Sequence, residues 1–311
     1  MMKVLITCPP MLGLINEFRP LFEAKGIQID CPSVTQTLSE EELKRLVPDY
    51  EGWIIGDDPA TGAVFQAGKE GKLKAAVKWG VGVDNVDFSA AKDLGIPVTN
   101  TPRMFGSEVA DIAIGYVIAL ARQTFSIDRQ VRAGQWPKPA GISLADKTVA
   151  LVGFGDIGRN VAKRLLAADM HVIAYDPYFQ IAQGLESLQS AAWPERLNEA
   201  DFIVLTCALT PENRHLINAA TLSLAKPGVR IVNVARGPLI DEIALEKALA
   251  AGHVHSVALD VFEIEPLPDA SPLRQYDRCI FGSHNASNTV DAVRRASDTA
   301  VRLLFDALGV N

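Results

Sequence analysis

Arg236, Glu265 and His284 are of the residue types that act together on a small carboxylic acid, and each follows an apolar, strand-like run. An arginine holds a carboxylate through its planar fork. A histidine titrates near neutrality, so it can exchange a proton with a hydroxyl or keto oxygen, and a carboxylate beside it orients the imidazole and favours its charged form. The three residues predict acid–base chemistry on a carbon next to a carboxylate.

Each of these residues also has an ordinary structural explanation. An arginine after a strand often lies at the surface, and the acidic pair Glu263 and Glu265 is typical of a solvated loop. A lone histidine is more often structural than catalytic, and we interpret the other four as structural or exposed: His171, His215, His253 and His255. The triad is therefore a hypothesis that depends on the elements positioning it.

A glycine-rich segment predicts a dinucleotide site. Gly153, Gly155 and Gly158 form a G-x-G-x-x-G between a strand pattern, Thr148–Val152, and a helix pattern, Asn160–Ala168. The first glycine allows a tight turn, the second lets a pyrophosphate approach the backbone, and the third lets the helix pack on the sheet. The hexapeptide alone is weak evidence, but its strand–loop–helix context favours a nucleotide site over a plain glycine-rich turn.

The acidic residue that follows this segment indicates which nucleotide is bound. Asp176 ends the next strand pattern, eighteen residues after Gly158. Its carboxylate can accept hydrogen bonds from both ribose hydroxyls and would repel a 2′-phosphate. The next three residues, 177–179, supply no Arg or Lys to hold that phosphate. The sequence therefore predicts NAD rather than NADP.

Strand-like runs alternate with amphipathic stretches along nearly the whole chain, which is typical of parallel sheets built from β-α-β units. The first series of expected strands is Val4–Thr7, Gln28–Asp30, Gly52–Ile55, Ala75–Lys78 and Pro97–Thr99. The second series is Thr148–Gly153, His171–Tyr175, Phe202–Thr206, Val229–Asn233, Ser256–Val261 and Cys279–Phe281. The carboxyl ends of parallel strands lie at one edge of a sheet, so the predicted triad converges there.

The two series predict an α/β fold with two doubly wound parallel-sheet domains. Residues 1–101 form a smaller, flavodoxin-like substrate-binding domain, to which a C-terminal helix within 286–311 returns. Residues 102–285 form a Rossmann NAD-binding domain. A length of 311 residues agrees with two domains.

Composition excludes several other classes of protein. The net charge is -7 at pH 7 and no basic stripe is present, so we expect no nucleic-acid partner. No apolar stretch of about 18 residues occurs, and the N-terminus lacks a secretory pattern, so we expect no membrane span and a cytoplasmic enzyme. The four cysteines have no metal-ligand spacing, so we expect free thiols and no metal.

Taken together, the motifs resemble those of the D-isomer specific 2-hydroxyacid dehydrogenases, most of all the phosphoglycerate dehydrogenase branch. Besides the glycine loop, the matching segments are Gly80–Asp87, Asn100–Pro102, Tyr175–Pro177, Val234–Gly237, Leu259–Phe262, Glu265–Pro266 and His284–Thr289. The resemblance implies hydride transfer between NAD and a small 2-hydroxy or 2-keto acid. It also implies that Arg236 binds the substrate carboxylate, Glu265 is the partner of the histidine, and His284 is the acid/base.

The resemblance implies further contacts and a homodimer. Substrate contacts would come from Lys78, Val81, Gly82, Arg236 and His284. Cofactor contacts would come from Gly153, Gly155, Asp156, Ile157, Gly158, Asp176, Cys207, Val234, Ala235 and Asp260. Members of the family are usually dimers that pair through the nucleotide domain.

Departures from the phosphoglycerate pattern leave the substrate open between 3-phosphoglycerate and an acid of the hydroxypyruvate or glyoxylate type. That branch often carries an arginine where this chain has Gly56, although Lys78 keeps a cation nearby. Trp79 replaces a small residue, and Asp156 places an acid beside the expected pyrophosphate. A formate- or phosphite-oxidising enzyme and a non-catalytic NAD(H)-sensing protein that acts through partner binding are the alternatives.

Overall fold

The computed structural model describes residues 1–310, and the chain forms two compact units. Unit 1 contains Met1–Phe105 and the chain from Asn288 onward, and unit 2 contains Gly106–Ser287. From the sequence we expected the boundaries between the two domains at 101/102 and 285/286, a few residues before the boundaries of the units in each case.

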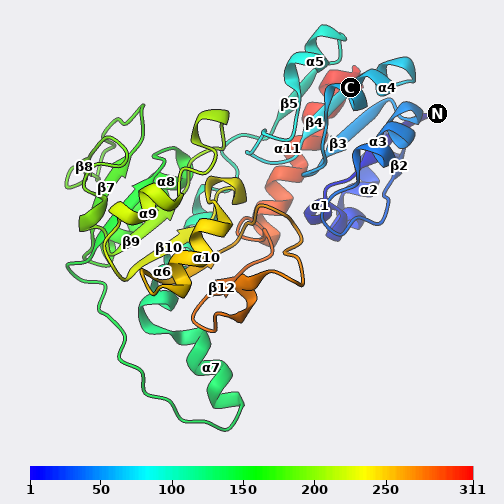
Figure 1. The fold of residues 1–311 in the computed structure, drawn as a ribbon. Helices are drawn as coiled ribbons and strands as arrows, with labels where there is room; N and C mark the ends of the chain where they lie inside the picture. Colours follow the sequence, from blue (N-terminus) through cyan, green and yellow to red (C-terminus); the bar gives the residue numbers. More distant parts are fainter. Residues whose placement is uncertain (311) are drawn as a thin grey trace. The chain divides into compact units, whose positions relative to one another are not determined.

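Unit 1 is built on a five-stranded sheet in which every neighbouring pair is parallel. The strands are β1 (Met2–Ile6), β2 (Ile27–Asp30), β3 (Gly52–Ile55), β4 (Ala75–Lys78) and β5 (Val98–Asn100) (Figure 1). Their order, β2-β1-β3-β4-β5, is the flavodoxin-like order that the sequence predicted. The order reverses at β1 and β3, which makes this neighbouring pair the switch point of the sheet.

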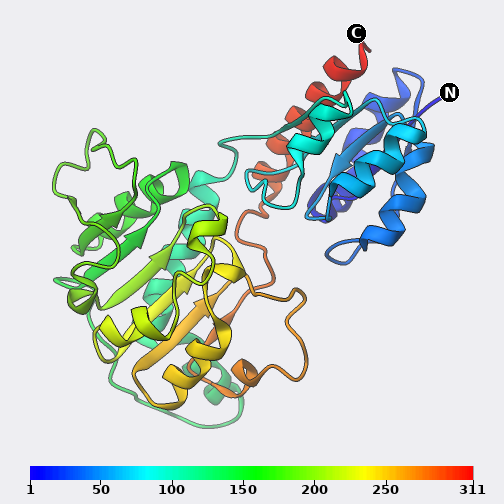
Figure 2. The ribbon, with the colours of Figure 1, turned by 45° about the horizontal axis from the view of Figure 1, so that its top comes forward.

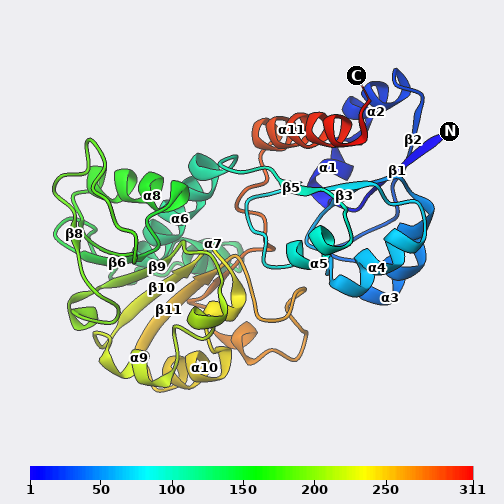
Figure 3. The ribbon, with the colours of Figure 1, turned by 90° about the horizontal axis from the view of Figure 1, so that it is seen from above.

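Helices cover both faces of this sheet, as Figure 3 shows. One face carries α1 (Pro9–Gly13), α2 (Ile15–Glu23) and α11 (Val290–Leu308), and the other carries α3 (Glu40–Leu46), α4 (Gly62–Glu70) and α5 (Phe88–Asp93). The final helix packs against β3 and β4 of this sheet. Local signals fix the helix starts; Ser39 and Glu42, for example, form a capping box at α3.

Unit 2 contains a seven-stranded sheet that is also parallel throughout. Its strands are β6 (Thr148–Val152), β7 (His171–Tyr175), β8 (Gln189–Ser190), β9 (Phe202–Leu205), β10 (Val229–Asn233), β11 (Val254–Leu259) and β12 (Ile280–Phe281) (Figure 2). The order β12-β11-β10-β9-β6-β7-β8 is that of a Rossmann sheet with one added strand. Its switch point lies between β6 and β9.

The helices of unit 2 also form two layers. On one face α6 (Gly106–Arg122) packs against α8 (Asp156–Ala167), and on the other α9 (Ala219–Leu224) packs against α10 (Glu242–Ala250). Helix α7 (Thr124–Arg132) follows α6. Four short 3-10 helices complete this unit: η2 (Leu197–Glu199), η3 (Pro211–Asn213), η4 (Gly237–Leu239) and η5 (Pro272–Gln275). Another, η1 (Val47–Asp49), belongs to unit 1.

Strand β11 begins and ends two residues before the predicted Ser256–Val261. It starts at Val254 because this residue pairs with Val229 of β10. It ends at Leu259, and the carboxylate of the next residue, Asp260, accepts hydrogen bonds from the backbone N–H groups of Asn285 and Ala286. The predicted strand was therefore shifted by two residues, and the shift places Asp260 in the loop.

His255 of β11 makes the stability of unit 2 sensitive to acid. Burial, together with the positive charges of Arg230 and Arg278, lowers the pKa of His255 from 6.5 to about 4. Between these values the unfolded chain binds more protons than the folded one, so stability falls as the pH falls through this window. Because the imidazole is partly exposed, solvent screening weakens this effect on stability.

We expect His255→Gln to keep the side-chain size and to remove this titration. Between pH 7 and pH 5 the free energy of unfolding of the variant should fall by about 1 kcal/mol less than that of the wild type. Denaturant titrations at the two pH values measure the difference. An equal loss in both proteins would show that His255 does not contribute to the acid sensitivity.

Candidate active site

The three glycines of the loop after β6 have different surroundings. Gly153 has a φ of 95°, and a Cβ there would lie 2.5 Å from the backbone nitrogen of Cys207. A Cβ at Gly158 would lie 2.1 Å from the carbonyl oxygen of Gly153. At Gly155 a Cβ would meet nothing within 4 Å. The first and third glycines thus allow close internal packing, while the second leaves open space over its backbone, as a phosphate cradle requires.

Helix α8 begins directly after this loop, with Gly155 as its N-cap and Asp156 and Ile157 as its first residues. A glycine cap has no side chain to bond the first N–H groups of the helix, which therefore suit a phosphate. A Cβ on Gly106 would lie 2.4 Å from Oδ2 of Asp156, so this carboxylate lies against the start of α6. A negative charge is favourable at that helix end.

Asp176 lies beside the glycine loop, as the sequence predicted. Its Oδ2 accepts a hydrogen bond of 2.6 Å from the backbone N–H of Phe154, and its Oδ1 accepts one of 2.8 Å from the backbone N–H of Tyr178. These bonds hold the carboxylate at the end of β7. Each carboxylate oxygen keeps further acceptor capacity, so the fixed geometry still suits ribose hydroxyls.

Further predicted cofactor residues follow β9 and β10 at the same edge of the sheet. Cys207 lies next to Gly153, and burial raises the pKa of its thiol to about 11. The thiol is therefore protonated at neutral pH and acts as a small apolar group. Val234 and Ala235 form a buried turn directly after β10. All these residues surround the switch point between β6 and β9, where open α/β sheets bind ligands.

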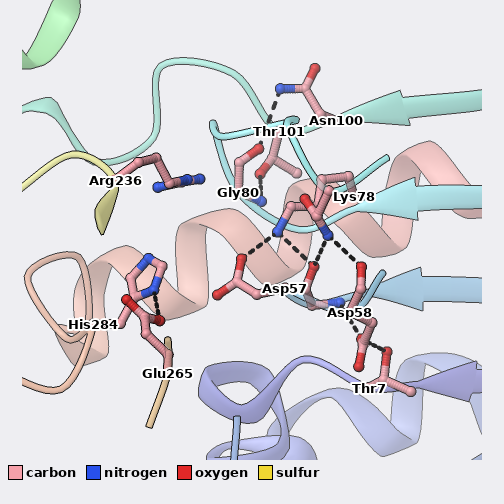
Figure 4. Close-up of polar contacts among 12 residues, drawn as sticks. Thr7, Asp57, Asp58, Lys78, Gly80, Asn100, Thr101, Arg236, Glu265 and His284 are labelled. Atoms are coloured by element: carbon pink, nitrogen blue, oxygen red, sulfur yellow. Dashed lines mark hydrogen bonds and ion pairs between the residues drawn. The ribbon is translucent and has the colours of Figure 1, made fainter. Parts of the chain in front are cut away.

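The predicted histidine–carboxylate pair is formed within unit 2 (Figure 4). Nδ1 of His284 lies 2.8 Å from Oε2 of Glu265. A carboxylate only accepts hydrogen bonds, so Nδ1 carries the hydrogen and Nε2 is left for a proton exchange. Oε1 of Glu265 accepts a hydrogen bond of 2.9 Å from the N–H of Phe262, which fixes the carboxylate. Figure 4 shows the second ring nitrogen on the side away from Glu265, toward Arg236.

Asp260 anchors the segment that carries the histidine. Its carboxylate is buried and accepts hydrogen bonds from the N–H groups of Asn285 and Ala286, and its carbonyl oxygen accepts one of 2.7 Å from His284. Burial raises the pKa of Asp260 above its ordinary value. His284 is held in a left-handed conformation with a φ of 55°. A strained backbone fixed by a buried polar group is typical of a functional position.

Arg236 follows β10 in a turn that is built around one buried amide. The side chain of Asn233 is buried; it accepts a hydrogen bond of 3.0 Å from Ala235 and donates one of 2.9 Å to the carbonyl oxygen of Arg236. A Cβ on Gly237 would lie 1.8 Å from the carbonyl oxygen of Phe262. Glycine at this position therefore lets the loops bearing Arg236 and Glu265 touch. Neither Asn233 nor Gly237 was among the predicted site residues.

A second histidine–carboxylate contact lies on the loop that carries Glu265. Nε2 of His215 lies 2.6 Å from Oε1 of Glu263, whose backbone N–H donates a hydrogen bond to Glu242. Burial and the nearby negative charges of Glu263 and Glu265 raise the pKa of Glu242. His215 was interpreted as structural or exposed, and its pairing with Glu263 joins two loops. No spacing in the sequence indicates this contact, because it depends on how the loops fold.

In unit 1 the expected substrate loop follows β4. Gly80 has a φ of 125°, its N–H donates to Oγ1 of Thr101, and its carbonyl oxygen accepts from Asn100 (Figure 4). These bonds to the end of β5 anchor the base of the loop, while Val81 is exposed and Gly82 half-buried. The backbone of both residues therefore lies at the surface, as a carboxylate cradle requires.

Lys78 was expected to offer a cation to the substrate, but its charge is balanced within unit 1. The side chain is 2% exposed, and Nζ donates hydrogen bonds to the carbonyl oxygen of Gly56 (2.6 Å) and to Oδ1 of Asp57 (2.9 Å). Asp57 was not among the predicted site residues. A single aspartate after a strand carries no signal in the sequence that it pairs with a buried lysine.

Within residues 1–310, no group of three or more His, Cys, Asp or Glu side chains is placed to hold a metal ion. Over the same residues, no helix has the length and apolar character needed to cross a membrane.

Comparison with known proteins agrees with the fold. Residues 114–286 match the family model described as D-isomer specific 2-hydroxyacid dehydrogenase, NAD binding domain. A hydroxypyruvate reductase of Thermotoga maritima is 37% identical over 89% of this chain and 90% of its own length. A D-3-phosphoglycerate dehydrogenase of Methanocaldococcus jannaschii is 36% identical over 95% of this chain but only 55% of its own length. The solved NAD complex of a Staphylococcus aureus formate dehydrogenase has a TM-score of 0.86 at 27% identity and covers 99% of this chain and 95% of its own.

The Rossmann unit, its phosphate loop and the histidine–carboxylate pair define a nicotinamide-dependent dehydrogenase. The chain belongs to the D-isomer specific 2-hydroxyacid dehydrogenase family. It is an NAD-dependent oxidoreductase that transfers a hydride between the nicotinamide and a small 2-hydroxy or 2-keto acid. No observation favours the alternative of a non-catalytic NAD(H)-sensing protein.

Proposed function

We propose that this enzyme reduces small, unphosphorylated 2-keto acids of the hydroxypyruvate or glyoxylate type. The observation that carries the chemistry is the 2.8 Å contact between Nδ1 of His284 and Oε2 of Glu265, at the sheet edge that also carries Arg236. The relatives named hydroxypyruvate reductase and glyoxylate reductase match over 90% and 82% of their own lengths, which supports the choice of acid.

In this proposal each residue has one task. In unit 2, Arg236 binds a carboxylate through its fork. In unit 1, the backbone of Val81 and Gly82 offers N–H groups to a carboxylate. Protonated His284 donates the Nε2 proton to the oxygen of the keto group as negative charge develops there, and Glu265 holds the imidazole in position. When bound, the nicotinamide supplies the hydride. Asp176 and the backbone at Gly155 to Ile157 hold the nucleotide.

We further propose that the enzyme acts as a homodimer in the cytoplasm. Three large apolar side chains of α7 and the loop after it, Phe125, Val131 and Trp136, are exposed, and a partner subunit would cover them. The four cysteines are free thiols, which suits a reducing compartment. Light scattering of the purified protein tests the dimer.

The test of this function is the oxidation of NADH in the presence of a panel of acids. We expect turnover with hydroxypyruvate or glyoxylate, and lower efficiency with pyruvate, longer branched 2-keto acids and 3-phosphohydroxypyruvate. NADH should be preferred over NADPH, because Asp176 repels a 2′-phosphate. Failure of every acid, with NADH binding intact, would refute the proposed activity, and a preference for NADPH would refute the role of Asp176.

A further inference from the structure

A polar cluster occupies the switch point of the sheet in unit 1. Strands β1 and β3 are neighbours there, and the chain leaves them through Thr7 and through Gly56 to Asp58. In an open α/β sheet this edge is where ligands bind. Lys78 ends the adjacent strand β4, directly before the loop with Val81 and Gly82. The cluster is therefore placed where it can meet the part of the substrate beyond its carboxylate.

The lysine of this cluster is buried, while its partner reaches the surface. The side chain of Lys78 is 2% exposed and that of Asp57 is 37% exposed. Burying an ammonium group is costly unless a counter-charge and hydrogen bonds compensate it. Asp57 and the carbonyl oxygen of Gly56 provide both. Solvent and ligands on this side consequently meet a carboxylate before they meet the lysine.

The neighbouring residues cannot add positive charge. A Cβ at Gly56 would lie 2.7 Å from the carbonyl oxygen of Thr7, so no cationic side chain fits there without moving backbone. Asp58 is buried and accepts hydrogen bonds from Thr7, from the N–H of Leu38 and from the N–H of Gly56. Burial raises the pKa of Asp58, and its hydrogen bonds commit it to the fold. Neither Gly56 nor Asp58 therefore adds a positive charge beside the Asp57–Lys78 pair.

We propose that the Asp57–Lys78 pair selects the substituent on the keto carbon of the substrate: it accepts a hydrogen or a hydroxymethyl group and rejects a phosphorylated one. This inference rests on the proposed function and deepens it. A hydroxyl group both donates and accepts, so it can bond to the carboxylate of Asp57. A phosphate group carries nearly two negative charges, so the carboxylate of Asp57 would repel it. Lys78 does not offset this repulsion, because its positive charge is already paired with Asp57.

The test compares kcat/KM for hydroxypyruvate and for 3-phosphohydroxypyruvate in wild type, Asp57→Asn and the control Asp93→Asn. The control removes an exposed carboxylate from α5. We expect the wild type to favour hydroxypyruvate by about tenfold or more, and Asp57→Asn to shift the ratio toward the phosphorylated acid by about tenfold. Asp93→Asn should leave the ratio unchanged. Higher salt should narrow the ratio of the wild type, since Asp57 is partly exposed.

The outcomes separate this inference from the proposed function. Loss of turnover with every acid in the wild type would remove the proposed function and the inference with it. Two outcomes would overturn the inference alone. In the first, Asp57→Asn reduces hydroxypyruvate with an unchanged ratio of the kcat/KM values for the two acids. In the second, the wild type prefers the phosphorylated acid. Asp57→Ser, which also removes the charge, and the salt dependence of the wild type decide the matter should Asp57→Asn fold poorly.

Discussion

His284→Gln is expected to lower kcat for 2-keto acid reduction by about 10²- to 10⁴-fold and to leave the affinity for NADH nearly unchanged. The glutamine side chain is close in size and polar but cannot deliver a proton at neutral pH. The hydrogen bonds that hold Asp176 beside the glycine loop come from the backbone N–H groups of Phe154 and Tyr178, so the nucleotide site should stay intact.

Two measurements separate loss of proton transfer from loss of structure. Steady-state kinetics give kcat, and a fluorescence titration of NADH gives its dissociation constant. The control is His171→Gln, which changes an exposed histidine at the start of β7 and should keep full activity. Near wild-type turnover in His284→Gln would rule out His284 as the acid, and a large loss of NADH affinity would assign it a role in cofactor binding instead.

Glu265→Gln tests the carboxylate of the same pair. Oε1 of Glu265 bonds to a backbone N–H and Oε2 to the imidazole, so an amide can keep one contact but loses the charge that stabilises the imidazolium ion. The pH profile of kcat should change in this variant, because only the charged carboxylate of Glu265 favours the protonated form of His284. A merely structural role for Glu265 would leave the pH profile in place.

Features that depend on the alternation of strand-like and amphipathic stretches, or on local motifs, could be predicted from the sequence. The bounds of β3, β4, β7 and β10 match the predicted ranges, because apolar runs and turn residues mark their ends. The glycine loop and Asp176 were found from their spacing together with the strand and helix patterns around them. Parallel strands place their carboxyl ends at one edge, which is why three strand-end residues pointed to one site.

Features that depend on contacts between loops could not be predicted. Strand β8 has two exposed residues at the edge of the sheet, so it has no apolar pattern. The partners of Lys78 and His215 come from other loops, and the sequence does not indicate which residue a charged side chain pairs with. Lys78 shows the consequence: the sequence indicated an available cation, whereas the fold pairs it with Asp57.

Arg236→Gln is expected to lower kcat/KM for the 2-keto acid by about 10²- to 10³-fold, with most of the loss in KM. A charge-assisted, two-pronged bond to the substrate carboxylate would be lost, and glutamine has neither the charge nor the fork. The turn itself should remain, because Asn233 builds it through backbone groups of Ala235 and Arg236.

Arg236→Lys should fall between the wild type and Arg236→Gln, since it keeps the charge and loses the planar geometry. Arg196→Gln is the matched control, because it removes an exposed arginine from a pair with Glu199 on the surface of unit 2. Kinetics with a 2-keto acid and with the corresponding aldehyde that lacks the carboxylate make the test specific. The penalty of Arg236→Gln should vanish for the aldehyde, and an equal penalty for both compounds would show that Arg236 acts on something other than the carboxylate.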